Sequence, residues 1–396
     1  MPWRETDRYD ERVKFVSQVL AAEWDVDELC SSYGVSRKTG YKMLARYRES
    51  GFEGLRDQSR APQLHPNQTS EEVEGMVLVL RALHGHWGPK KLRRLMEKSN
   101  PGRTLPALST IGGILKRHGL VVPRRRRSRA KVTSLPFVKA EGPNDVWRTD
   151  FKGAFKAKDG ARCEPLTLTD EYSRFALMCR LMARTGGAHV RPAFEAAFRE
   201  FGLPKRLRTD NGPPFASVGL CGLSRLSIWW LKLGIEVEHI APGKPQENGG
   251  HERFHLTLKQ ETALPPKATR KAQQAASERF LDEYNHVRPH EALGMKTPAE
   301  LYEASPRPYP RQLPEFEYPR HFEVRNAKAD GYIMWKGRLY FVSESLAREA
   351  VGLEPVADGR WRIYLGRLEL GTLDEEKHAV LKNKGMRYRQ IDEAQE

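Results

Sequence analysis

Three acidic residues stand in contexts that favour shared chemistry. Asp150 ends the strand-like segment VWRTDF, and Asp210 comes directly before the Asn-Gly turn of RTDNGPPF. Glu252 follows the paired glycines of PGKPQENGGHERFH, where a helix is expected to begin. Carboxylates that converge repel one another unless a divalent cation neutralises them. Two Mg²⁺ ions about 3.5–4 Å apart in such a site would clamp the attacking and leaving oxygens of a phosphoryl displacement.

Each of these signals is weak alone, because Asp-Asn-Gly is more often an ordinary turn and a single strand-end aspartate carries little information. The order of several motifs carries more. The segments WRTDFKG, LTLTDEYSRF, RTDNGPPFAS, APGKPQENGGHERFHLTLK and YNHVRPHEALGMKTPAELY follow one another along the chain. Together they resemble the integrase-core transposases of bacterial insertion sequences, which are relatives of retroviral integrases with an RNase H-like fold and an Asp-Asp-Glu triad. The resemblance covers about residues 143–303.

This resemblance implies that Asp150, Asp210 and Glu252 are the catalytic residues and the metal ligands. It also implies two Mg²⁺ ions, with Mn²⁺ as a substitute. The enzyme class it implies is a metal-dependent polynucleotidyl transferase. No covalent protein–DNA intermediate is expected in that class, so no serine or tyrosine nucleophile should be essential.

The third acid has two candidates. Glu252 fits the family pattern Pro-x-x-x-Gly-x-x-Glu together with Pro245 and Gly249, but 41 residues separate it from Asp210. The family separation is often shorter, and Glu247, with 36 intervening residues, fits that criterion better. Glu247 lies between a proline and the Asn-Gly turn, in an expected loop. We choose Glu252 because the first turn of a helix is a rigid element that can aim a side chain.

Other polar residues near these motifs have competing interpretations. His255 and Lys259 lie three and seven residues after Glu252, so all three share a helix face. We expect both to contact the DNA backbone beside the scissile phosphate, although a solvated amphipathic helix gives the same pattern. Asp170, in TDEYSRF, is interpreted with the serine and arginine that follow it as a turn and salt-bridge element rather than a metal ligand.

The composition favours a nucleic-acid partner. The chain has 396 residues, a formal net charge of +16 and a pI of about 9.7. Such an excess of basic residues favours a polyanion, with nucleic acid ahead of an anionic membrane. The 4 cysteines are far apart and show no zinc spacing, which favours reduced thiols. Without a signal-peptide core or a long apolar run, we expect a cytoplasmic, nucleoid-associated protein with no membrane partner.

The sequence that precedes the three acidic residues predicts two helix-turn-helix domains. The first, residues 1–60, has a turn at Gly34, Ser36 as an N-cap and a basic second helix suited to the major groove. The second, residues 61–122, has Ser109 as the N-cap of its last helix. An ordinary helical bundle with a basic surface is the alternative. The expected DNA contacts are Arg37, Lys38, Lys42, Arg46, Lys116 and Arg117.

A basic linker, residues 123–140, follows. Its arginines Arg124, Arg125, Arg126 and Arg127 are expected to lie along phosphates, where each contact adds salt-dependent affinity; a solvated linker is the alternative. Residues 141–305 mix strands with helices, which predicts an RNase H-like α/β core with a helical extension. In GAHVRPAFEAAFREFG, Phe194, Ala197, Phe198 and Phe201 are expected to face inward. Residues 315–390 alternate like a small β-rich domain, so the whole is a multidomain α+β protein.

The function implied by the resemblance is DNA transposition. The protein would bind the terminal inverted repeats of a mobile element, cut there with metal ions, and join the 3′-OH ends to target DNA. Double-stranded DNA and further copies of the chain, as a homo-oligomer on DNA, are the expected partners. One alternative is a catalytically silent, transposase-derived repressor, which the intact acids argue against. Another is a simple metal nuclease, for which paired helix-turn-helix domains have little use.

Overall fold

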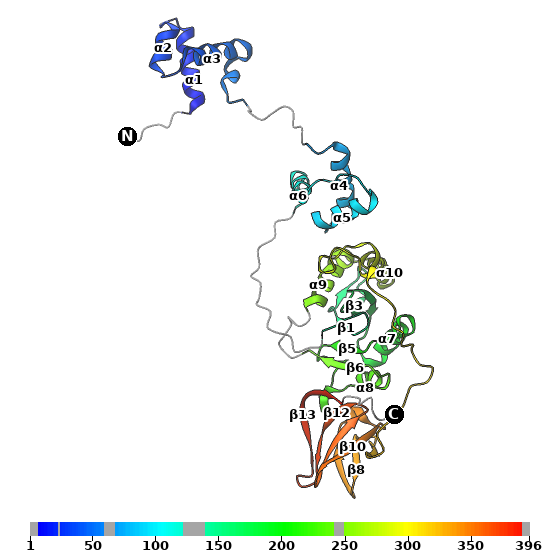
Figure 1. Cartoon of the computed structure of the whole chain (residues 1–396). Helices are drawn as coiled ribbons and strands as arrows, with labels where there is room; N and C mark the ends of the chain where they lie inside the picture. Colours follow the sequence, from blue (N-terminus) through cyan, green and yellow to red (C-terminus); the bar gives the residue numbers. More distant parts are fainter. Residues whose placement is uncertain (1–6, 23, 59–67, 122–138, 241–248, 390–396) are drawn as a thin grey trace. The chain divides into compact units, whose positions relative to one another are not determined.

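The computed structural model describes residues 7–22, 24–58, 68–121, 139–240 and 249–389. Figure 1 shows the helical N-terminal part, the central sheet with its helices, and the C-terminal strands. The chain divides into two compact units, Met1–Ser70 and Glu71–Glu396. In the part of the chain that the structure describes, no helix has both the length and the apolar character needed to cross a membrane.

The first unit is a small helical bundle. Phe15, Val16, Leu29 and Leu55 are buried at its centre. The backbone turns at Gly34 with φ of 64°, and the Ser36 hydroxyl accepts a hydrogen bond from the Thr39 N–H. Both the predicted turn and the predicted N-cap are therefore confirmed. The elements are α1 (Arg8–Leu20), α2 (Val26–Ser32), α3 (Arg37–Ser50) and η1 (Gly51–Leu55).

A second helical group begins the other unit. Its elements are α4 (Glu71–Leu83), α5 (Pro89–Ser99) and α6 (Leu108–Arg117), packed around Trp87, Leu92, Met96 and Ile111. The prediction that Ser109 caps α6 is wrong. Ala107 is the N-cap, because its extended backbone already presents the carbonyl that accepts from the Ile111 N–H. Ser109 lies inside the first turn.

A mixed sheet forms the centre of the second unit. The strands hydrogen-bond in the order β2-β3-β1-β5-β6, and β4 pairs with β3. β1 runs antiparallel to β3 and parallel to β5, and β5 runs parallel to β6. The strands are β1 (Val146–Phe151), β2 (Phe155–Lys156), β3 (Arg162–Asp170), β4 (Ala176–Met182), β5 (Arg206–Thr209) and β6 (Glu236–His239).

One side of this sheet packs against α7 (Gly187–Phe201) and α8 (Arg225–Lys232), with η2 (Leu220–Gly222) before α8. Phe194, Ala197 and Phe198 are buried in this layer, as predicted, and Phe201 is partly buried. The indoles of Trp147, Trp229 and Trp230 share the same cluster. This aromatic core fixes the β1 and β5 strands whose ends carry the aspartates.

The other helical layer contains α9 (Gly249–Leu258) and α10 (Arg270–Asp282). Phe254 and Leu258 of α9 and Phe280 of α10 cluster with Ala176 and Cys179 of β4. The remaining segments of this layer are η4 (Lys259–Ala263), η5 (Glu283–Val287), η6 (Glu291–Leu293) and η7 (Pro298–Glu300).

The C-terminal part is β-rich, as predicted. An antiparallel sheet has the order β13-β12-β11-β10-β7, and β8 pairs with β9. Leu353, Ile363, Leu365 and Leu370 are fully buried in its core. The elements are β7 (Glu323–Asn326), β8 (Tyr332–Trp335), β9 (Arg338–Phe341), η8 (Glu344–Leu346), β10 (Ala350–Ala357), β11 (Arg360–Leu365), β12 (Leu368–Asp374) and β13 (Ala379–Tyr388).

Candidate functional site

The two aspartates lie level with each other at the ends of adjacent parallel strands. Asp150 is in β1, and Asp210 comes directly after β5. The register pairs Arg148 with Arg208, so two residues further along both strands the aspartates are neighbours. Adjacent strands are about 4.8 Å apart. The sheet therefore brings together two of the three acids that the sequence singled out.

The Asp210 carboxylate sits in the turn that follows its strand. Its Oδ1 accepts a hydrogen bond of 3.2 Å from the Gly212 N–H. Burial raises the pKa of Asp210, and the Gly212 N–H partly offsets this rise. A carboxylate that is desolvated in this way is stabilised by a nearby cation.

A pair of buried histidines anchors α9 to the sheet beside Asp150. The Thr167 hydroxyl donates to the main-chain oxygen of Asp150 over 3.0 Å. It has one hydrogen, so it must accept from Nε2–H of both His251 and His255, each at 2.7 Å. Nδ1 of His251 then carries no hydrogen and accepts from the Thr169 hydroxyl at 3.1 Å. The hydrogen-bond balance thus assigns one ring tautomer to each histidine.

Both rings are neutral. Burial lowers the pKa of His255 to about 3 and that of His251 well below its ordinary value. Nδ1 of His255 lies 3.9 Å from Oδ2 of Asp150. The expectation that His255 contacts DNA is wrong, because the ring is buried and points to β3. Lys259, the other residue expected to contact DNA from this helix, is exposed.

The Glu252 carboxylate is not gathered with those of Asp150 and Asp210 into a group that could hold a metal ion. Glu252 is in the first turn of α9 with its side chain exposed. Among the described residues, no group of three or more His, Cys, Asp and Glu side chains is gathered tightly enough to hold a metal ion. Mutual repulsion disfavours three close carboxylates by themselves. Carboxylate oxygens are nevertheless the donors that Mg²⁺ prefers, so the chemistry of this set fits that ion. Pro245 and Glu247, the alternative third acid, are outside the described residues.

A partly buried ion network ties β1 to β5 just before the aspartates. Glu171 accepts from Arg148 at 2.6 Å and from Arg208 at 2.5 Å. Arg208, only 2% exposed, also donates to Glu238 at 2.9 Å. This network was not predicted from the sequence. Its signal was the repeated Arg-Thr-Asp of residues 148–150 and 208–210, which puts each arginine on the same side of its strand as the aspartate two residues later.

Gly250, the second glycine before Glu252, leaves room for two arginine side chains. A Cβ on Gly250 would lie 2.4 Å from Nη1 of Arg174 and 3.3 Å from Nη1 of Arg148. Glycine lets both guanidinium groups approach the backbone of the first turn of α9. The start of the helix that carries Glu252 is therefore packed against arginines from β1 and from the turn after β3.

Asp170 is the last residue of β3, and its carboxylate holds the turn that follows, as predicted for a turn element. Its carboxylate accepts from the N–H and the hydroxyl of Ser173 and from the Asn144 N–H. Burial raises its pKa despite these donors. The carboxylate is thus satisfied within the turn, and Arg174, the expected salt-bridge partner, lies against Gly250 instead.

The structure places the other expected DNA contacts on the helical groups. Arg46 is partly buried and donates to Gln58 at 2.9 Å. Arg117 pairs with Glu74 at 3.0 Å. Residues 124–127 of the basic linker are outside the described residues. The exposed side chains are those of Arg37, Lys38 and Lys42 in α3 and of Lys116 and Arg117 in α6.

Family models match most of the regions described above. The integrase core domain matches residues 140–245, and a second model of the integrase core domain matches residues 233–298. A helix-turn-helix domain matches residues 11–63, and a homeodomain-like domain matches residues 39–115.

Similar proteins include two from bacterial insertion elements. An uncharacterized 31.7 kDa protein of insertion element IS407 from Burkholderia multivorans is 28% identical over 60% of this chain and 82% of its own length. An uncharacterized 39.2 kDa protein of insertion element IS476 from Xanthomonas euvesicatoria is 28% identical over 60% of this chain and 66% of its own length. The Gag-Pol polyprotein of baboon endogenous virus is 27% identical over 46% of this chain and 10% of its own length.

Solved structures to which the chain is similar in part include viral integrases. The HTLV-2 integrase catalytic core domain in complex with magnesium covers 42% of this chain and 100% of its own, with 18% identity and a TM-score of 0.33. A simian T-cell lymphotropic virus intasome, in complex with PP2A regulatory subunit B56 gamma, covers 74% of this chain and 97% of its own, with 19% identity and a TM-score of 0.36.

Proposed function

The chain is an insertion-sequence transposase by family, with helix-turn-helix regions ahead of an integrase core, and from this premise we propose that it cuts and joins DNA. It binds the terminal inverted repeats of a mobile element, hydrolyses a phosphodiester bond at each end, and joins the freed 3′-OH to target DNA. The observation that carries the proposal is the level placement of Asp150 and Asp210 at adjacent strand ends.

We propose that Asp150, Asp210 and Glu252 hold two Mg²⁺ ions, or Mn²⁺ in their place. Bound there, the ions would supply Lewis-acid stabilisation of the charge that develops on phosphate oxygens. The neutral His251 and His255 hold α9 on β3 beside Asp150, and Glu252 in the first turn of this helix would complete the site. The partly buried Arg148–Glu171–Arg208 network keeps the two aspartate strands in register.

The reaction consists of two displacements at phosphorus. In the first, a water oxygen bonds to the phosphorus at the element end, the bond from phosphorus to the 3′ oxygen breaks, and the 3′ oxygen takes up a proton as the water loses one. In the second, the freed 3′ hydroxyl attacks a target phosphodiester, and the 3′ oxygen of the target leaves. Neither step needs a covalent bond between protein and DNA.

The proposed partners are double-stranded DNA and further copies of this chain. The exposed basic side chains of α3 and α6 would contact the inverted repeats, and Lys259 would contact the backbone near the cut. The basic residues 124–127 would follow phosphates in the same way. Two ends must be cut and joined together, which requires a homo-oligomer on DNA.

The alternative function is a catalytically silent, transposase-derived repressor. The observation that favours it is the exposed position of Glu252, which is not gathered with the aspartates into a group that could hold a metal ion. Such a protein would bind the ends and never cut them.

Strand cleavage and joining on duplexes from the inverted repeats that flank the gene tests the proposal. With Mg²⁺, the wild type and Glu247→Gln should cut and join, whereas Asp210→Asn and Glu252→Gln should bind the ends without cutting. Glu247→Gln is the matched control, because it removes the same charge five residues away. If Glu247→Gln is inactive and Glu252→Gln active, Glu247 is the third acid. If the wild type binds but never cuts, the repressor function replaces the transposase.

A further inference from the structure

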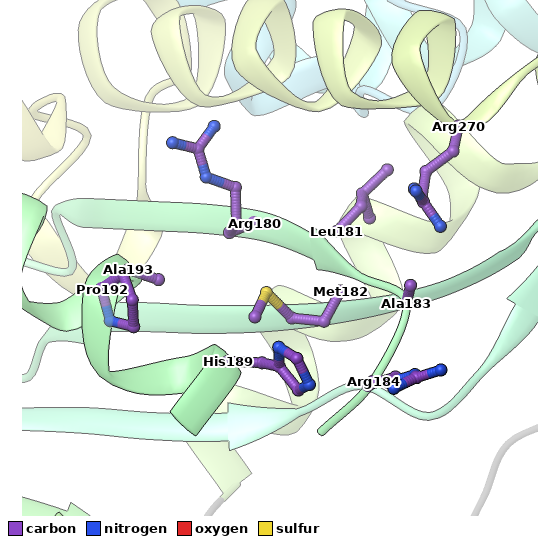
Figure 2. A pocket seen from close by; sticks show the side chains of 9 residues that line it. All are labelled: Arg180, Leu181, Met182, Ala183, Arg184, His189, Pro192, Ala193 and Arg270. Carbon is purple, nitrogen blue, oxygen red and sulfur yellow. The ribbon is translucent and has the colours of Figure 1, made fainter. Parts of the chain in front are cut away.

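A basic pocket lies outside the carboxylate site. It has a volume of about 530 Å³ and lies where the end of β4, the start of α7 and the start of α10 meet. Figure 2 shows Arg180 and Arg270 on one side of the hollow and Arg184 and His189 on the other. The apolar side chains of Leu181, Met182, Pro192 and Ala193 complete the lining.

The cations of this pocket have few acidic partners among the described residues. Within the described residues, Arg184 and Arg270 have no ion pair, and Arg180 has only a loose contact of 3.9 Å with the exposed Glu278. No acidic residue lines the pocket. By contrast, Arg148 and Arg208 on the same sheet are paired at 2.5–2.6 Å. The three guanidinium groups therefore leave a local excess of positive charge that favours an anion.

The pocket is close to the candidate site. Thr167 pairs with both Asp150 and Cys179, so Cys179 lies two strands from Asp150, roughly 10 Å away. Arg180 is the next residue along β4. On the other side, a Cβ on Gly187 at the start of α7 would lie 3.9 Å from Cβ of Pro214, in the segment that follows Asp210. The start of α7, which supplies part of the pocket lining, therefore lies beside the segment that follows Asp210.

We propose that this pocket binds successive phosphodiester groups of a DNA strand that runs past the carboxylates. The proposal rests on the proposed function, which supplies DNA as the substrate. Guanidinium groups match phosphate oxygens with paired hydrogen bonds. The arginines come from β4 and the residues directly after it and from the start of α10, around a hollow much larger than one phosphate ion, which favours a strand over a free anion. The apolar side chains would contact sugars or bases between the phosphates.

The first experiment measures the salt dependence of binding of the full chain to a duplex of random sequence, without a divalent metal. Each phosphate contact contributes about 0.9 to the slope of log affinity against log salt. The double variant Arg184→Glu, Arg270→Glu should lower that slope by about 2. The matched control Arg279→Glu changes an exposed arginine further along α10, outside the pocket, and should lower the slope by less than the pocket variants. Equal slopes for pocket and control variants would overturn the proposal.

The second experiment locates the DNA and does not depend on activity. A photo-crosslinking residue replaces Arg184 or, as the control, Arg279, and the full chain is irradiated with labelled duplex in Ca²⁺ buffer. Crosslinking from position 184 but not 279 supports the pocket. Inorganic phosphate should compete no better than chloride at equal ionic strength; selective loss of the crosslink in phosphate would show a free-anion site and overturn the DNA assignment.

These results separate the two proposals. If the wild type never cuts DNA but position 184 crosslinks to it, the pocket stands and the proposed catalysis fails. If the wild type cuts and joins normally, and position 184 does not crosslink, the pocket proposal fails alone.

Discussion

At the scale of single residues, Thr167 controls the hydrogen bonding beneath α9. Its hydroxyl donates to the main-chain oxygen of Asp150 and accepts hydrogen bonds from two histidine rings. Water is not an alternative partner for Thr167 and His251, because both are almost fully buried. A change at this position therefore leaves buried donors unpaired, which costs more than the loss of an exposed hydrogen bond.

Thr167→Val should lower the free energy of unfolding by at least about 2 kcal/mol, because two buried histidine N–H groups lose their acceptor. Thr167→Ser keeps the hydroxyl and should cost less than about 1 kcal/mol. Urea denaturation of the full chain, followed by tryptophan fluorescence, measures both. Equal losses for valine and serine would show that the hydroxyl contributes no more than the methyl group, against this role for the hydroxyl.

The same network predicts how stability depends on pH. The pKa of His255 is about 3 in the folded chain, below its ordinary value of 6.5, so the unfolded chain binds the extra proton first as the pH falls. The stability that this residue contributes is complete above pH 6.5 and is lost progressively towards pH 3. Between pH 6.5 and 5 the loss should be about 2 kcal/mol. Urea denaturation at pH 7 and 5 should show a smaller difference for His255→Gln than for the wild type; an equal difference would assign the pH dependence to other groups.

At the scale of elements, the sheet depends on side chains that join strands and helices. Glu171 lies between Arg148 of β1 and Arg208 of β5. Because Arg208 is almost fully buried, water cannot easily replace a carboxylate that it loses. η5, which follows α10, has a comparable role at the edge of the sheet. The Asn285 amide in η5 accepts from the Ala176 N–H and donates to the Ala176 carbonyl, which satisfies the first residue of the free edge of β4.

Glu171→Gln should destabilise the chain by about 3 kcal/mol, because it leaves a buried arginine short of a counter-charge. The control Glu195→Gln breaks the pair with Arg199 on the surface of α7 and should cost at most about 0.5 kcal/mol. Thermal and urea denaturation of the two variants give the comparison. Similar small losses would show that Glu238 alone is sufficient for Arg208.

Asn285→Ala should speed hydrogen exchange at the Ala176 amide, because the β4 edge loses its amide partner. The expected loss of stability is about 2 kcal/mol for two buried hydrogen bonds. Asn285→Asp is the matched variant: it keeps an acceptor for the N–H but places a carboxylate against the carbonyl. Hydrogen-exchange mass spectrometry on β4 peptides measures the effect, and unchanged exchange in both variants would contradict this role for Asn285.

At the scale of the whole molecule, recognition and chemistry are assigned to different parts of the chain. The first unit carries the exposed basic face of α3, and the second carries the acids, the anchored α9 and the basic pocket. Changes in α3 should therefore alter binding to the element ends without altering the geometry around Asp150.

Lys38→Ala with Lys42→Ala should weaken binding to inverted-repeat duplexes and lower the salt slope by about 2, one unit for each phosphate contact removed. Lys14→Ala is the control, because this lysine of α1 is paired with Glu11 in the same unit. Fluorescence anisotropy over a range of salt concentrations measures the slopes. A slope equal to that of the control would remove this face of α3 from the DNA interface.

Much of this protein was determined by its sequence alone. Hydrophobic periodicity and turn residues predicted the helical groups, the inward face of α7 and the β-rich end, because these depend on local spacing. The strand-end positions of Asp150 and Asp210 were predictable from the sequence, and the parallel pairing of β1 with β5 places these residues side by side. Ser36 and Gly34 were predictable for the same local reason.

The tertiary structure alone decided which way ambiguous polar side chains point. His255 and Lys259 both fit the helix face of Glu252, but only the packing of α9 on β3 made His255 a buried anchor and left Lys259 exposed. The Arg148–Glu171–Arg208 network and the basic pocket join residues far apart in the chain, so no periodicity could show them. Burial and hydrogen-bond balance are set by neighbours in space, and those neighbours exist only after the strands and helices have packed.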